Sequence, residues 1–224
     1  MIKKFFSKKQ KIEAQTIVDL RDYTPQALSN IKSIAAVALL ILPENPDEAF
    51  IEAFSKINLD AIGFTLNLSK DKKIVTYNGI YSLTNIDLPD HTLGVFNGIF
   101  VMSRAITNEN AQYVINGIML KKSGLRHNSK CLMENGLIFE MDFEENDLKF
   151  FSNKIDIDLS FIRNIKENSL IASADTITIA ADVTEEAIIE KSIRFFAANK
   201  IICNRAIKGC VQARACVANK IISE

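Results

Sequence analysis

The sequence contains no tryptophan, only two histidines, four cysteines and eight glycines among 224 residues. It also lacks a recognisable catalytic motif. Lysine plus arginine and aspartate plus glutamate both number 27, so no overall positive charge favours a nucleic-acid partner. The longest apolar run, Ile34 to Pro43, covers about half of the roughly 20 residues that a transmembrane helix needs. Because 48% of the residues are apolar, the chain is expected to fold around a sizeable core.

The start of the chain has no signal-peptide pattern, because Lys8, Lys9 and Lys11 interrupt it before a long apolar stretch forms. A cytoplasmic location is therefore expected, where thiols stay reduced. The cysteines form no Cys-x-x-Cys pair, and the spacings of seven and six residues between the last three match no common zinc pattern. We interpret all four as small apolar residues, and we expect neither a metal nor a cofactor: Cys131, Cys203, Cys210 and Cys216.

One motif repeats at a constant spacing through the middle of the chain. Asn-Gly followed by Ile or Leu occurs four times, 19 residues apart each time, and accounts for half of the eight glycines. Weaker copies, in which Asn or Asp is followed two positions later by Ile, continue at spacings of 18 to 24 residues. Internal periodicity of this length indicates a repeat architecture. The eight units start at Asn78, Asn97, Asn116, Asn135, Asn153, Asp175, Asn199 and Asn219.

Strand-like runs rich in β-branched and aromatic residues flank the motif, and they leave two architectures open. In a parallel β-solenoid, or β-helix, each repeat is one coil, and like positions stack about 4.8 Å apart. In an antiparallel β-meander, each Asn-Gly is the turn of a hairpin. The runs before and after the motif differ in length, and the later units replace Gly with Lys or Thr, which a hairpin turn accepts poorly. The pattern therefore favours a mainly β protein with a solenoid of about 19–20 residues per coil over residues 71–224.

The solenoid interpretation predicts two stacks of side chains. Asn and Gly both tolerate the left-handed backbone of a sharp bend, so the asparagines are expected at one structural corner: Asn78, Asn97, Asn116 and Asn135. The aliphatic residues two positions later are expected to form one buried, inward-facing ladder: Ile80, Ile99, Ile118 and Leu137.

The first third of the chain has a different pattern. Helices are expected to begin at Thr24-Pro25 and at Asn45-Pro46, each followed by a strand, over residues 34–42 and 61–68. Aligning Ile31 with Ile57, and Val37 with Ile62, gives a repeat of 25 to 26 residues that resembles the geometry of a leucine-rich repeat. Residues 16–70 are interpreted as a helix–strand module that caps the first coil of the solenoid.

Few residues in the sequence are candidates for catalysis or metal binding. His91 and His127 lie 36 residues apart without a patterned Cys or Ser partner, and we interpret them as solvated loop residues. The acidic stretch Asp142 to Asp147 lacks the order of a calcium loop and is interpreted as a solvated turn. We assign no catalytic residue and expect a protein that is not an enzyme.

Residues 1–15 are expected to form a flexible basic tail that adds nothing to the core, with five lysines in the first eleven residues and no acid before Glu13. An anionic bilayer attracts such a segment at about 1 kcal/mol per lysine, and aromatic insertion adds to this. A solvated tail without a partner is the alternative. The residues expected to touch a membrane are Ile2, Lys3, Lys4, Phe5, Phe6, Lys8 and Lys9.

The start Met-x-x-Lys-Phe-Phe-Ser-Lys-Lys-Gln, followed by the repeats of about residues 74–222, resembles the bactofilins, polymer-forming cytoskeletal proteins of bacteria. The resemblance implies a β-helix of roughly 17 to 20 residues per coil that polymerises end to end. It also implies that the tail touches the inner membrane. The helix–strand module and the eight glycines of this chain depart from the family, whose coils are rich in Gly and Val.

Two classes of function follow from these patterns. The first is a non-enzymatic scaffold or assembly protein, cytoplasmic and peripheral to the inner membrane. The alternative is a ligand-binding or carbohydrate-active β-helix that uses a surface groove.

The last coil is expected to mediate self-association. An open solenoid end exposes strand edges and apolar side chains, and the helix–strand module is expected to cover the opposite end. One covered end and one open end favour a two-fold dimer through residues of about 205–224. The contact is expected at Cys216, Val217, Ile221 and Ile222.

Overall fold

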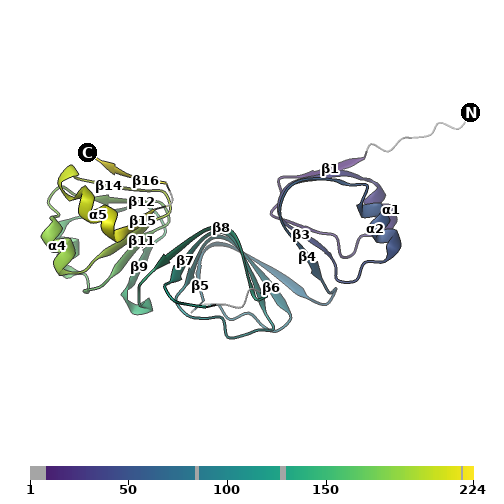
Figure 1. Cartoon of the computed structure of the whole chain (residues 1–224), viewed down its shortest axis with the longest axis horizontal. Helices are drawn as coiled ribbons and strands as arrows, with labels where there is room; N and C mark the ends of the chain where they lie inside the picture. The colour runs from purple at the N-terminus through teal and green to yellow at the C-terminus, as the bar shows by residue number, and fades with distance from the viewer. Residues whose placement is uncertain (1–8, 84–85, 127–129, 218) are drawn as a thin grey trace, which may run out of the picture. The chain divides into compact units, whose positions relative to one another are not determined.

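A computed structural model describes residues 9–83, 86–126, 130–217 and 219–224 of the chain. The fold is mainly β, and its sheets are parallel (Figure 1). The chain divides into two compact units, Met1–Ile74 and Val75–Glu224. The antiparallel meander is wrong for the Asn-Gly strands, because Ile99 pairs in parallel register with Ile118 of the following strand.

The first unit contains a parallel sheet with a helix before each of its two long strands. Strands β1 and β2 pair side by side with the two halves of β3, and β4 pairs with the other edge of β3. Val37 lies opposite Ile62, as the 25-residue alignment of the two units predicted. The elements are β1 (Gln10–Glu13), β2 (Ile17–Asp19), α1 (Pro25–Ser29), β3 (Ile31–Pro43), α2 (Glu48–Phe54) and β4 (Asn58–Leu68).

Side-chain caps set the start of both helices in this unit. The hydroxyl of Thr24 accepts a hydrogen bond from the N–H of Ala27, and the carboxylate of Asp47 accepts one from the N–H of Phe50. The second helix therefore starts two residues later than the sequence pattern at Asn45 suggested. Each helix buries one large side chain, Leu28 or Phe50, against the sheet.

The prediction of a flexible tail over residues 1–15 is wrong from Gln10 onward. Strand β1 pairs with β3, and Ile12 is buried in the core of the first unit. The alternating pattern of Gln10–Glu13 has one buried apolar residue among three polar ones, which is enough for an edge strand but too little to mark one in the sequence.

The four Asn-Gly units form one parallel sheet in the order β5-β6-β7-β8. Asn97 lies opposite Asn116, which lies opposite Asn135 on the next strand. Each Asn-Gly lies inside a long strand rather than between two strands. The strands are β5 (Lys73–Ser82), β6 (Thr92–Met102), β7 (Gln112–Lys122) and β8 (Leu132–Met141).

The predicted inward-facing ladder of Ile80, Ile99, Ile118 and Leu137 is wrong. Ile99 is buried, but Ile118 is half-buried and Leu137 is 51% exposed. The next residues along the strands, Phe100 and Met119, contribute to the interior cluster with Phe96. Successive side chains alternate between the faces of a strand, so the residue directly after Gly points to the opposite face.

That opposite face packs against the first sheet of the chain's last third. Val101, Leu120 and the half-buried Ile118 belong to one cluster with Leu170 and Phe196. The rings of Phe139 and Phe196 meet edge to face, with centroids 5.4 Å apart. Of the aliphatic residues after Asn-Gly, Ile118 thus packs between two sheets instead of filling the interior of one coil.

In the last third, each repeat contains two short strands, and a helix follows the second strand in the first three repeats. The first strands form the sheet β9-β11-β13-β15 and the second strands form the sheet β10-β12-β14-β16 (Figure 1). The strands are β9 (Leu148–Phe151), β10 (Ile155–Ile157), β11 (Leu170–Ser173), β12 (Thr176–Ile179), β13 (Arg194–Ala197), β14 (Lys200–Cys203), β15 (Ala215–Val217) and β16 (Lys220–Ser223). The helices are η1 (Glu145–Asp147), α3 (Leu159–Asn164), α4 (Glu185–Glu190), η2 (Arg205–Ile207) and α5 (Lys208–Arg214).

The stacked aliphatic position of the four later units is confirmed by the strand register. Ile155 pairs with Ile177, Ile177 with Ile201, and Ile201 with Ile221. Ile177 and Ile201 are fully buried in the core between the two sheets and the helices. The sequence interpretation missed α3, α4 and α5, whose buried residues Ile162, Ile188 and Val211 close the third side of this core.

Candidate functional sites

The four asparagines of the Asn-Gly units form a chain of side-chain hydrogen bonds. The Nδ2 of Asn97 donates to the Oδ1 of Asn78 at 2.9 Å, Asn116 donates to Asn97 at 2.9 Å, and Asn135 donates to Asn116 at 3.0 Å. Every bond runs in the same direction along the stack. The stack lies inside the long strands, at the residues directly before the glycines.

The glycines beside these asparagines allow the strands to approach closely. Gly98, Gly117 and Gly136 have φ angles of +125°, +149° and +158°. A Cβ on Gly117 would lie 2.2 Å from the carbonyl oxygen of Gly98. Only glycine fits such a backbone without displacing the neighbouring strand.

A second polar stack forms at the turns that connect the two sheets of the last third. The Nδ2 of Asn199 donates to the Oδ1 of Asp175 at 2.9 Å, and that of Asn219 donates to the Oδ1 of Asn199 at 3.3 Å. The hydrogen bonds from Asn199 and Thr176 lower the pKa of the Asp175 carboxyl, so it stays ionised at neutral pH. This stack sets the register of β12, β14 and β16.

The residues expected to mediate self-association lie on β15 and β16, at the edges of the two sheets. Val217 and Ile221 pack against the core of the last third, and Cys216 packs against the cluster around Phe196. These three residues and Ile222, the fourth member of the predicted contact, are only half-buried. Their equivalents one repeat earlier are more deeply buried: Phe196, Ala197 and Ile201 are fully buried, whereas Ile202 is also half-buried.

The residues expected to contact a membrane fall almost entirely outside the described part of the chain. Ile2, Lys3, Lys4, Phe5, Phe6 and Lys8 lie outside it, and Lys9 is exposed directly before β1. No helix among the described residues is both long and apolar enough to cross a bilayer.

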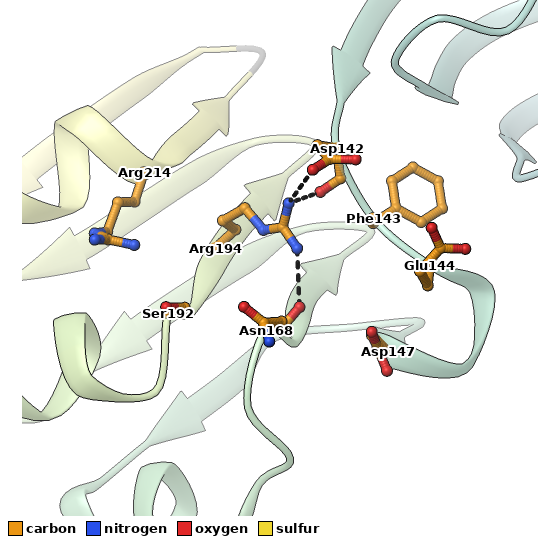
Figure 2. A pocket seen from close by; sticks show the side chains of 8 residues that line it. All are labelled: Asp142, Phe143, Glu144, Asp147, Asn168, Ser192, Arg194 and Arg214. Carbon is orange, nitrogen blue, oxygen red and sulfur yellow. Dashed lines mark hydrogen bonds and ion pairs between the residues drawn. The ribbon is translucent and has the colours of Figure 1, made fainter.

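A surface hollow that the sequence interpretation missed lies between the β8–β9 connection and the start of β13. It has a volume of about 400 Å³. Figure 2 shows Arg194 in its centre, with its guanidinium directed at Asp142 and Asn168. Its Nη2 donates to the carbonyl of Asn168 at 2.9 Å, and its Nη1 donates to the carbonyl of Asp142. The lining residues are Asp142, Phe143, Glu144, Asp147, Asn168, Ser192, Arg194 and Arg214.

The acidic stretch expected to be a solvated turn thus contributes to a hollow. Asp147, which is nine-tenths buried, pairs with Lys166, and Glu144 pairs with Lys122 at 2.6 Å. A second hollow of about 450 Å³ shares Asp142, Arg194 and Arg214 with the first. The arginines could not be recognised in the sequence, because the repeat length varies in this part of the chain and hides their equivalence.

Three of the four cysteines are partly or fully buried in the last third of the chain. Burial raises the pKa of Cys203, Cys210 and Cys216, so these thiols stay protonated at neutral pH. His91 is exposed in a turn, and His127 lies outside the described residues. Within the described ranges, no group of three or more His, Cys, Asp or Glu residues is arranged to hold a metal ion.

No family model matches the sequence, and neither a curated protein nor a solved structure is found to be similar to it.

Proposed function

We propose that the chain is a β-solenoid without enzymatic activity, which acts as a structural or assembly protein by pairing with a second copy of itself. Two features support the solenoid: the 19-residue parallel register of β6, β7 and β8, and the strand–strand–helix repeats of the last third. In both parts, equivalent residues of successive repeats stack side by side.

One observation carries the proposal of self-association. Strands β15 and β16 are the edges of two neighbouring parallel sheets, and Val217 and Ile221 on them are half-buried. Their equivalents on the preceding strands, Ala197 and Ile201, are fully buried because the next repeat covers them. A further layer on β15 and β16 would bury the last repeat in the same way.

A second copy provides such a layer with matching chemistry. A two-fold axis through the exposed edge places β15 and β16 against strands of the same sequence, now antiparallel, and it satisfies the edge N–H and C=O groups of both copies. Contacts of this kind close on themselves, so they produce a dimer rather than a filament. The bactofilin resemblance stays a prediction, and it would require an open polymer instead.

Charged substitutions at the edge test this proposal. Val217→Asp should convert a dimer into a monomer, because its carboxylate would be buried in the contact without a partner. Ile189→Asp is the matched control, since Ile189 on α4 is 51% exposed in the same part of the chain. Light scattering should show a dimer for the unmodified chain and for Ile189→Asp. A dimer that persists in Val217→Asp would exclude this edge as the contact.

The tail proposal is independent of the dimer. We place the chain in the cytoplasm, at the inner face of an anionic membrane, on the basis of the lysines and phenylalanines that precede β1. A dimer would present two tails to one surface and so strengthen a weak contact.

A further inference from the structure

Arg194 and Arg214 occupy equivalent positions in successive repeats. Phe195 on β13 pairs with Ala215 on β15, so the residues directly before them lie next to each other. The equivalent position on β11 is Leu170, which carries no charge. Neighbouring strands are about 4.8 Å apart. The last two repeats therefore bring two arginines, one at the start of β13 and one at the end of α5, into the lining of both adjoining hollows.

The carboxylates of the hollow do not neutralise both arginines. Each lies in an ion pair with a different cation: Asp142 with Arg194, Glu144 with Lys122, and Asp147 with Lys166. Within the described part of the chain, this leaves Arg214 without a carboxylate partner. Figure 2 shows Arg214 on the side of Arg194 that faces away from Glu144 and Asp147.

Arg194 is held in place but incompletely satisfied. Two backbone carbonyls, of Asp142 and Asn168, fix the orientation of its guanidinium, and neither carries a formal charge. Its partner carboxylate is 3.6 Å away, and the Asp142 side chain is 82% exposed. The buried Nε of Arg194 has no hydrogen-bond partner among the described residues. A positioned arginine with an exposed, weakly held counter-ion can exchange that carboxylate for a ligand.

We infer that the hollow between Arg194 and Arg214 is a binding site for a phosphate group. Arginine presents a planar fork of N–H donors that matches a phosphate oxyanion, and two arginines that line one hollow favour a doubly charged ligand. A bound phosphate would supply Arg214 with the negative charge that the paired carboxylates of the hollow do not provide. The volume of about 400 Å³ accommodates a phosphate with a small organic group attached.

Inorganic phosphate is the first probe, titrated into the full-length chain at low salt and pH 7.5. The arginine Nε–H signals in nuclear magnetic resonance spectra report binding at the guanidinium groups directly. We expect saturable shifts for two arginine signals with phosphate, and much weaker shifts with acetate, which carries a single charge. Vesicles that contain phosphatidic acid form a separate arm, which distinguishes a lipid headgroup from a phosphate in solution.

Three substitutions make the inference falsifiable. Arg214→Gln should weaken phosphate binding about tenfold or more, because it removes a charge-assisted contact. Asp142→Asn should strengthen it severalfold, roughly up to fivefold, because it removes the competing carboxylate. Arg163→Gln, on the exposed face of α3, is the control and should bind like the unmodified chain.

The two opposite effects separate a site from general attraction of anions. If phosphate causes no saturable shifts, or if acetate binds equally well, the inference is wrong. It is also wrong if Arg163→Gln weakens binding as much as Arg214→Gln does. Circular dichroism of each variant establishes that it is folded, and Asp142→Asn alone decides the case if Arg214→Gln does not fold.

Discussion

Gly117→Ala tests the close approach of the Asn-Gly strands. The new Cβ would lie 2.2 Å from the carbonyl oxygen of Gly98 and 3.0 Å from its nitrogen, both backbone atoms that cannot rotate away. The φ angle of +149° at Gly117 adds strain, which for an L-residue costs about 1–3 kcal/mol. Displacing a packed neighbour adds about 1–3 kcal/mol. We therefore expect Gly117→Ala to lower the free energy of unfolding by about 2–6 kcal/mol.

Two other glycines provide matched controls. Gly124 also has a positive φ, of +77°, but a Cβ there would meet nothing within 4 Å, so Gly124→Ala should cost only about 1–2 kcal/mol. Gly209 lies in α5 with equally open space, and Gly209→Ala should be neutral or stabilise by up to about 1 kcal/mol. The three substitutions are chemically identical and differ only in backbone conformation and space.

Tyrosine fluorescence during urea unfolding is a suitable assay. The chain has no tryptophan and four tyrosines, of which Tyr77, Tyr81 and Tyr113 lie in the Asn-Gly sheet. Tyr77 stacks on Phe96 with ring centroids 4.6 Å apart, so the signal reports the packing of this sheet. If Gly117→Ala loses no more stability than Gly124→Ala, the strands do not approach each other as described.

Three further predictions concern other parts of the chain. Asn116→Ala removes two side-chain hydrogen bonds of the asparagine stack and should lower the free energy of unfolding by about 1–3 kcal/mol in the same assay. Burial alone would raise the pKa of Asp19, but hydrogen bonds from Arg21 hold it below its ordinary value. The Asp19–Arg21 pair should therefore stabilise the first unit fully above about pH 4, and this stabilisation should be lost as the pH falls through the lowered pKa. Urea unfolding at pH 2–5 measures this pH dependence, which Asp19→Asn should abolish. Deleting residues 1–9, which precede β1, should leave the melting temperature unchanged and abolish binding to anionic vesicles; equal vesicle binding would refute the membrane contact.

The parallel register of the middle of the chain could be predicted, because a constant 19-residue spacing places like residues opposite each other. Which face the aliphatic residues occupy could not. A glycine with positive φ inside a strand gives no sign in the sequence that the strand continues through it, so the alternation of side chains beyond Asn-Gly could not be followed. The bends at Ala14, Ala36 and Ala61, with φ of 56°, 53° and 50°, were equally hidden, because alanine carries no signal for a positive φ.

The helices of the last third were missed for a different reason. Helices α3, α4 and α5 span six or seven residues and bury one residue each, so no apolar period repeats along them. Their caps are visible in retrospect: Asp158 accepts from the N–H of Phe161, and Thr184 accepts from that of Ala187. The arginine pair was hidden because the aligned residues Asp175, Asn199 and Asn219 are 24 and then 20 residues apart. Repeats of unequal length obscure which residues stack.

Sedimentation equilibrium of the unmodified full-length chain tests the proposed self-association most directly. Over a range of concentrations, the account predicts the mass of two chains of 25.0 kDa each, with no larger species. The mass of one chain at every concentration would show that β15 and β16 need no second copy. A mass that grows continuously with concentration would instead indicate an open polymer, and it would contradict the two-fold contact.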